Sequence, residues 1–296
     1  TLDLRRELAA GMPARLTALR PAEPGGADCH EQKGGTLLVA GGAFTAERAR
    51  RIALQLEAEV AADDGADLVL ASRHQGEVDE AAAEIARDFG HQAIGVAADV
   101  VNPADVENLV QTTLKKFGKI DVLINNAGIN IRGPIDELTY EQFKQVHDIN
   151  VDGLWLCSRA VVPHMKKANY GRIINLASTL GVVGLANRTP YASSKGAVVQ
   201  MTRALGLELA PFGITCNAIC PGWVLTPLVQ KQVDAKAQAQ GLSNEEATRQ
   251  LLGEKEPSMQ FTTPEELGEL AVFFCSAAAH NVRGVAWNMD GGWAAQ

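Results

Sequence analysis

The chain has 296 residues, 46% of them hydrophobic, so it can bury a large core as one large domain or two small ones. Its 27 basic and 35 acidic residues give a formal net charge of −8. This charge argues against nucleic acid or an anionic membrane as the main partner, because phosphates are bound by clustered Lys and Arg.

The first 33 residues are predicted to form an appendage and linker, because a short amphipathic pattern is followed by the breaker-rich PAEPGGADCHEQKGG. From residue 34 to 296, β-rich apolar runs alternate with segments of helical period such as VENLVQTTLKKF. The runs cover residues 36–40, 67–71, 93–98, 121–128, 171–178, 214–222 and 284–292. This alternation predicts one α/β domain, a doubly wound parallel sheet with helices on both faces.

The cysteines and the apolar runs indicate where the protein works. Five cysteines form no CxxC pair and lie mostly within apolar runs, which predicts buried thiols in a reducing compartment. They are Cys29, Cys157, Cys216, Cys220 and Cys275. No apolar run approaches the roughly 20 residues of a membrane span, and the N-terminal TLDLRRELAAG is too charged for a signal peptide. We therefore expect a cytoplasmic protein that spans no membrane.

In a doubly wound sheet, ligands bind outside the carboxyl ends of the strands, so the residues after each apolar run are candidate site residues. These residues include NNAG (125–128), Asn150, Ser178, the pair Tyr191 and Lys195 in YxxxK, and PGWVLT (221–226). YxxxK alone is a weak signal, but the ordered set resembles the short-chain dehydrogenase/reductase family over residues 36–296. The resemblance implies a Rossmann-type fold and an NAD(P)-dependent oxidoreductase.

The residue types suit hydride transfer, which needs a group that removes or supplies the hydroxyl proton of the substrate. A free tyrosine is a poor base at neutral pH, since its pKa is about 10. Tyr191 and Lys195 are four residues apart and share one helix face, so the ammonium can stabilise the phenolate. The resemblance implies that Ser178 orients the substrate oxygen and that Asn150 holds a proton-relaying water. Taken singly, each residue also fits a structural role.

The resemblance also implies a set of cofactor-binding residues. They are Gly41, Ser72, Arg73, Asp99, Val100, Asn126, Ala127, Gly128, Tyr191, Lys195, Pro221, Gly222, Val224 and Thr226. Asp99 corresponds to an aspartate that contacts adenine, although it equally fits a helix N-cap. Thr226 corresponds to a threonine that binds the nicotinamide carboxamide. The second strand ends with Arg73 and no carboxylate, which favours NADP. The resemblance of the C-terminal third favours NAD, and on that ground NAD is placed ahead of NADP.

The first βα loop departs from the family pattern TGxxxGxG. In VAGGAFTAERA (39–49), the positions of the second and third glycines are Thr45 and Glu47. Side chains there would crowd the phosphates, and a carboxylate at a helix N-terminus competes with a bound anion. Three explanations stay open: a rerouted loop that still binds cofactor, a lost cofactor site, or a local sequence error. The intact catalytic set favours the first and third over the second.

The C-terminal third resembles the bacterial D-3-hydroxybutyrate dehydrogenases. That resemblance implies a helical lid over about residues 227–262 and a site for a short hydroxy acid, with Arg188 binding the carboxylate. The substrate-binding residues so implied are Asn130, Ser178, Arg188, Trp223, Gln232 and Trp293. The resemblance also implies a homotetramer. No histidine has the spacing of a metal ligand, so we expect no catalytic metal.

Two features favour alternatives. Leu180 stands where hydroxybutyrate dehydrogenases have histidine, and the middle of the chain resembles gluconate 5-dehydrogenase. A sugar acid, a polyol or a 3-oxoacyl thioester is therefore an alternative substrate. Thr45 and Glu47 support a third hypothesis, a dehydrogenase-like protein that binds no cofactor and serves as a partner protein.

Overall fold

The computed structural model describes residues 36–40, 66–89, 92–253 and 255–296. The predicted appendage (1–33) lies outside the described residues. So does the altered loop with Gly41, Thr45 and Glu47.

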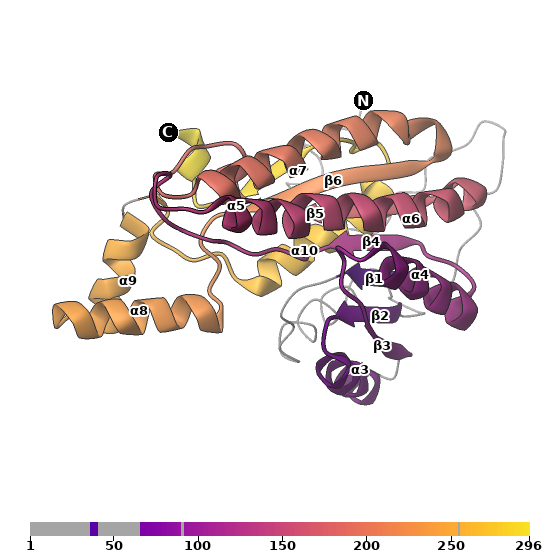
Figure 1. The fold of residues 1–296 in the computed structure, drawn as a ribbon, viewed down its shortest axis with the longest axis horizontal. Helices are drawn as coiled ribbons and strands as arrows, with labels where there is room; N and C mark the ends of the chain where they lie inside the picture. The colour runs from indigo at the N-terminus through magenta and orange to yellow at the C-terminus, as the bar shows by residue number, and fades with distance from the viewer. Residues whose placement is uncertain (1–35, 41–65, 90–91, 254) are drawn as a thin grey trace, which may run out of the picture. The chain divides into compact units, whose positions relative to one another are not determined.

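A seven-stranded parallel sheet forms the centre of the domain, in the order β3-β2-β1-β4-β5-β6-β7 (Figure 1). The strands are β1 (Thr36–Ala40), β2 (Asp67–Ser72), β3 (Ala93–Ala97), β4 (Val122–Asn125), β5 (Gly171–Leu176), β6 (Ile214–Pro221) and β7 (Ala286–Met289). Each strand falls within or next to one of the predicted apolar runs. The strand order reverses between β1 and β4, so the predicted Rossmann-type doubly wound fold is confirmed.

Helices cover both faces of the sheet, and two further helices, α8 (Pro227–Gln240) and α9 (Asn244–Gly253), lie beyond its end (Figure 1). The others are α3 (Gln75–Phe89), α4 (Pro103–Phe117), α5 (Tyr140–His147), α6 (Gly153–Ala168), α7 (Thr189–Glu208) and α10 (Pro264–Cys275). Buried residues of α3 and α10, such as Ile85 and Phe274, pack on one face. Leu109 of α4, Val161 of α6 and Val198 of α7 pack on the other, which faces the viewer in Figure 1.

Local signals fix where the helices begin and end. The side chain of Asn102 accepts a hydrogen bond from the Ala104 amide and caps α4, whose first residue is Pro103. The same helix ends at Gly118, which adopts a left-handed conformation with φ of 78°. Because Asn102 is the N-cap, the N-cap interpretation of Asp99 is wrong. Its carboxylate instead accepts a hydrogen bond from the Val101 amide at 3.2 Å.

Helices α8 and α9 stand beyond the end of the sheet (Figure 1). They share a small core of Val233, Ala237 and Ala247. The chain leaves the domain at Val224 and returns at Thr262, and these two residues pair in a parallel bridge. The segment predicted to be a lid is therefore a helical hairpin tied at its base.

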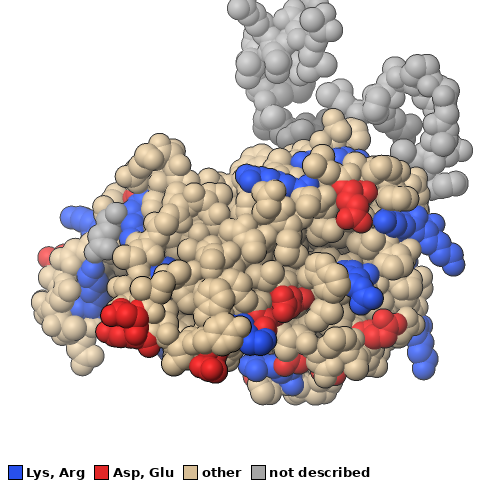
Figure 2. Space-filling view, turned by 45° about the horizontal axis from the view of Figure 1, so that its top comes forward, with Lys and Arg blue, Asp and Glu red and all other residues tan. Residues whose placement is uncertain are grey.

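None of the described helices is long and apolar enough to cross a membrane. On the face seen in Figure 2, basic and acidic side chains form small separate groups rather than one extended basic area.

Candidate active site

Helix α7 positions the two residues of the YxxxK motif at its N-terminal end. Lys195 is buried, and its ammonium donates a hydrogen bond to the carbonyl oxygen of Leu176 at 2.6 Å. The same nitrogen lies 5.6 Å from the centroid of the Tyr191 ring, on the same helix face. The end of β5 therefore fixes a positive charge beside the half-buried phenol, an arrangement that favours the phenolate.

A π-helical turn (Asp148–Asp152) joins α5 to α6 and carries the buried Asn150 at its centre. Such turns are rare in proteins, and those that occur often lie at functional sites. The amide of Asn150 accepts a hydrogen bond from the Ile129 amide at 2.8 Å and donates to the Ile129 carbonyl at 3.0 Å. It also donates to the hydroxyl of Ser194 at 2.9 Å. Asn150 thereby ties the loop after NNAG to α7.

At Gly128, which has no side chain, the backbone comes close to Asn150 and Lys195. A Cβ atom added at Gly128 would lie 3.4 Å from both the Asn150 Oδ1 and the Lys195 Nζ. The amides of Asn126 and Ala127 donate to the carbonyl of Ala40, which holds the NNAG loop against the end of β1. Asn150, Lys195 and the loop assigned to the cofactor therefore meet at one point.

Ser178 follows β5 and begins a 3₁₀ turn, Thr179–Gly181. Its hydroxyl is largely buried and accepts a hydrogen bond from the Leu180 amide at 3.2 Å. The hydroxyl proton stays available for another acceptor. The Thr179 hydroxyl donates to Asp290 at 3.2 Å, so the serine turn is anchored to the end of β7.

Six of the predicted cofactor residues line one cavity of about 270 Å³ at the ends of β2, β3 and β4. They are Ser72, Arg73, Asp99, Val100, Ala127 and Gly128. A carboxylate, a hydroxyl and a guanidinium at the strand ends are the groups that bind an adenosine and its substituents. The described residues thus fit the adenosine half of a dinucleotide, while the residues that would meet the pyrophosphate include the undescribed loop.

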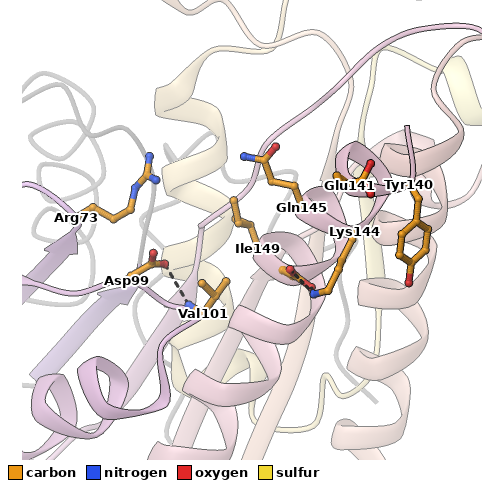
Figure 3. Close-up of a pocket in the computed structure, with 9 residues that line it drawn as sticks. Arg73, Asp99, Val101, Tyr140, Glu141, Lys144, Gln145 and Ile149 are labelled. Atoms are coloured by element: carbon orange, nitrogen blue, oxygen red, sulfur yellow. Dashed lines mark hydrogen bonds and ion pairs between the residues drawn. The ribbon is translucent and has the colours of Figure 1, made fainter. Parts of the chain in front are cut away.

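A second cavity of about 370 Å³ adjoins the first (Figure 3). Arg73 and Asp99 at the strand ends belong to both cavities, as does Ile149 from the π-helical turn. Lys144 lines only the second cavity, where its ammonium hydrogen-bonds Asp148, and this contact raises the pKa of Lys144. Arg73 can therefore reach an anionic group in either cavity.

The strand β6 leads into the PGWVLT turn. The Gly222 amide donates to the carbonyl of Met289 at 2.9 Å, so Pro221 and Gly222 are fixed beside β7. Val224 forms the bridge at the base of the α8–α9 hairpin. The hydroxyl oxygen of Thr226 caps α8 by accepting the Val229 amide at 3.3 Å, which leaves the hydroxyl proton to donate elsewhere.

Two guanidinium groups lie at the end of the site nearest the hairpin. The Gly133 amide donates to the Asn187 carbonyl at 3.3 Å, which brings the loop of Arg132 beside the first turn of α7 and Arg188. Burial lowers the pKa of Arg188, and the charge of Arg132 lowers it further. Arg132 also donates a long hydrogen bond, 3.4 Å, to the amide oxygen of Gln232 on α8. The sequence pattern identified Arg188 and Gln232 but missed Arg132.

The remaining substrate residues differ in exposure. Trp223 and Trp293 are partly buried, and the Lys255 ammonium lies 5.6 Å from the centroid of the Trp293 ring. Asn130 is exposed. No group of three His, Cys, Asp or Glu side chains in the described part of the chain could hold a metal ion.

The sequence comparisons agree with this arrangement. A sequence model of the family described as enoyl-(acyl carrier protein) reductase matches residues 49–294. D-beta-hydroxybutyrate dehydrogenase of Cupriavidus necator is 45% identical over 240 residues, which cover 81% of this chain and 92% of the relative. The enzyme of the same name from Rhizobium meliloti is 34% identical, over 67% of this chain and 77% of its own. The chain belongs to the short-chain dehydrogenase/reductase family.

A solved member of the family has the same fold. L-sorbose reductase of Gluconobacter frateurii, in complex with NADPH and L-sorbose, has a TM-score of 0.80 and 29% identity, over 88% of this chain and 97% of its own. Short-chain dehydrogenases/reductases are nicotinamide-dependent, so the predicted class, an NAD(P)-dependent oxidoreductase of hydroxyl and ketone groups, is confirmed.

Proposed function

We propose that the protein interconverts a short 3-hydroxy acid and its 3-oxo acid, in the first place D-3-hydroxybutyrate and acetoacetate. The observation that carries this proposal is Arg188, one helical turn before Tyr191 on α7, with Arg132 and Gln232 beside it. A guanidinium at this position can hold a carboxylate while the phenol meets the hydroxyl. The 45% identity to a D-beta-hydroxybutyrate dehydrogenase supports the same substrate.

The cofactor is proposed to be NAD or NADP. Ser72, Arg73 and Asp99 would hold its adenosine half, and Gly128 with Lys195 would hold the part nearest the reacting carbon. When bound, the nicotinamide supplies or accepts the hydride. Similarity to the hydroxybutyrate enzymes favours NAD, and Arg73 favours NADP.

Side chains of the protein would transfer the proton and orient the substrate oxygen. Tyr191 would donate a proton to the oxygen of the 3-oxo acid and take it back in oxidation. Lys195 supports the phenolate by its charge, and Ser178 donates its free hydroxyl proton to orient the substrate oxygen. Asn150 positions the loop after NNAG against α7 and would hold a water that returns protons to Lys195.

A sugar acid or polyol is the second candidate substrate. Leu180, buried beside Ser178, removes a polar contact that hydroxybutyrate dehydrogenases have, and the structurally similar L-sorbose reductase binds a sugar. A 3-oxoacyl thioester is a third candidate. If the altered loop abolishes cofactor binding, the chain would instead serve as a dehydrogenase-like partner protein.

Further proposals concern the hairpin and the assembly. We propose that α8 and α9 act as a lid, because the hairpin has its own small core and reaches the site through Gln232. We also propose a homotetramer in the cytoplasm, with helices α5, α6 and α7 packed between copies. Tyr140, Trp155 and Leu207 on these helices are 72%, 50% and 81% exposed, which supports such a face.

The first experiment is a titration of the protein with NADH and with NADPH, followed by nicotinamide fluorescence. Micromolar binding of either would show that the altered loop still accepts a cofactor and would choose between the two. Turnover of acetoacetate against a sugar acid, a polyol and a 3-oxoacyl thioester then tests the substrate. Absence of cofactor binding would favour the partner-protein hypothesis.

A further inference from the structure

Two buried carboxyl groups lie beside Gly222 of the PG turn, and the proposed reaction uses neither of them. Glu256 follows α9 and is 1% exposed, and Asp290 follows β7 and is 6% exposed. Gly222 lies between them. A Cβ atom added there would overlap Glu256 Oε1 and lie 2.9 Å from the Cα atom of Asp290. The PG turn therefore requires glycine because these two residues close around it.

Asp290 is fully engaged as a carboxylate. It accepts hydrogen bonds from the Thr179 hydroxyl at 3.2 Å and from the amides of Gly292 and Ala294 at 3.1 and 2.9 Å. Thr179 follows Ser178, so Asp290 joins the serine turn to the C-terminal turn. Three donors stabilise its negative charge.

Only one of the two carboxyl oxygens of Glu256 has a hydrogen-bond partner among the described residues. Its Oε1 atom accepts a hydrogen bond from the backbone amide of Trp223. Its Oε2 atom and the indole nitrogen of Trp223 are both buried without a hydrogen-bond partner among the described residues. Burial raises the pKa of Glu256 above its ordinary value, and the charge of Asp290 raises it further, against the opposing effect of the Trp223 amide. The neutral form is therefore less unfavourable here than for a carboxyl group in water.

The segment around Glu256 is docked on the C-terminal turn. The Ser258 amide donates to the Gly291 carbonyl at 3.0 Å, and the Gln296 side chain donates to the Lys255 carbonyl at 3.1 Å. Gly291 has a φ of 60° and approaches Ser258 and Glu256 too closely to admit a Cβ atom. The returning end of the α8–α9 hairpin thus packs against the turn that carries Trp293.

We propose that Glu256 is a positioning residue of the substrate site: it fastens Trp223 to the returning end of the hairpin, which is itself docked on the C-terminal turn that carries Trp293. The inference rests on the proposed function, which assigns both tryptophans to the substrate. Proton loss from Glu256 places a second negative charge beside Asp290. Among the described residues, Asp290 is the charged group that acts on Glu256, while the neighbouring Lys255 directs its ammonium over the Trp293 ring. The repulsion between the two carboxylates weakens the contact between Trp223 and the returning end of the hairpin.

The sign of the pH effect follows from the direction of the shift. A carboxyl group whose pKa is raised by folding stabilises the folded arrangement fully at pH values below its unfolded pKa. That contribution is lost as the pH rises through the folded pKa. The KM for the substrate should therefore rise with pH, whereas kcat changes less, because Tyr191 and Lys195 are held by α7 and β5.

The test uses the full chain and three variants. Glu256→Gln keeps an acceptor for the Trp223 amide and cannot ionise, and Glu256→Leu fills the space without an acceptor. Glu269→Gln removes an exposed glutamate of α10 and is the matched control. Two quantities are measured from about pH 5 to pH 9, a range above the ordinary carboxyl pKa of about 4.3. They are the KM for acetoacetate and the tryptophan fluorescence without substrate.

We expect the KM of the unmodified protein and of Glu269→Gln to rise with pH, while that of Glu256→Gln stays low throughout. Glu256→Leu should raise KM about tenfold at every pH, the effect of one lost buried hydrogen bond. The tryptophan emission should shift with pH in the unmodified protein and not in Glu256→Gln. Identical pH profiles for the unmodified protein and Glu256→Gln would overturn the inference, even if Glu256→Leu does not fold. If acetoacetate is not turned over, the proposed function fails, and the fluorescence profiles still decide the role of Glu256.

Discussion

The ammonium of Lys195 lies 5.6 Å from the centroid of the Tyr191 ring and is hydrogen-bonded to the carbonyl oxygen of Leu176. The charge is thus fixed beside the phenol by contacts within the protein. A phenol held in this way can act as a general base near neutral pH, where a free tyrosine is a poor one because almost none of it is ionised.

Replacement of Tyr191 by phenylalanine should therefore lower kcat by about 10²- to 10⁴-fold, the usual contribution of a general acid or base. Cofactor binding should persist, because the ring and the helix are unchanged. Steady-state kinetics and NAD(P)H fluorescence measure the two quantities separately. Tyr170→Phe, which removes a phenol that precedes β5 at the strand end opposite to the site, is the control and should change neither. Near-normal turnover in Tyr191→Phe would refute the assignment.

Asn150 offers a prediction about stability. Its amide makes hydrogen bonds to both backbone groups of Ile129 and to the Ser194 hydroxyl, all of them buried or partly buried. Asn150→Ala leaves these groups without partners and should lower the free energy of unfolding by roughly 1–3 kcal/mol or more. Urea denaturation measures the change. Ser194→Ala removes one of the three partners and should cost less. The double variant should fall short of the sum of the two single changes, because the residues share a hydrogen bond.

Much of the fold could be predicted from the sequence because its signals are local. Apolar runs mark the buried strands, and the spacing of Tyr191 and Lys195 places them on one helix face. Asp99 is a residue for which such local signals are ambiguous. The segment DVVNP contains two residues that can cap a helix, Asp99 and Asn102, and only the structure shows that Asn102 does so.

Other site residues could not be predicted because their roles arise from tertiary contacts. Arg132 and Glu256 lie in polar stretches where a charged side chain usually faces water. Arg132 meets Arg188 only because a backbone hydrogen bond joins Gly133 to Asn187. Glu256 is buried only because the returning end of the hairpin docks on the C-terminal turn, some 35 residues further along the chain.

Arg132 carries a prediction about substrate charge. It lies beside Arg188 and Gln232, and the described residues provide neither arginine with a carboxylate at salt-bridge distance. An anionic substrate would relieve the repulsion between the two cations. Arg132→Gln should therefore raise the KM for acetoacetate about tenfold, as expected for a lost charged hydrogen bond.

The KM for the uncharged methyl acetoacetate separates a role in charge recognition from a role in folding. It should change little in Arg132→Gln, because the ester carries no negative charge. Arg249→Gln, on the exposed side of α9, removes the same charge elsewhere and should affect neither substrate. Equal increases in KM for the acid and the ester would mean that Arg132 supports the structure of the loop and does not recognise the carboxylate.

The cysteines give a prediction that needs no substrate. Cys157, Cys216, Cys220 and Cys275 are free and buried. Burial raises the pKa of Cys157, Cys216 and Cys275 to about 12 and that of Cys220 to about 11. The thiolate is the reactive form, so these four thiols should resist a disulfide reagent at neutral pH in the folded protein. All five cysteines of the chain should react after denaturation in urea. The variant Cys29→Ser isolates the four, and rapid reaction of this folded variant would contradict the burial of at least one thiol.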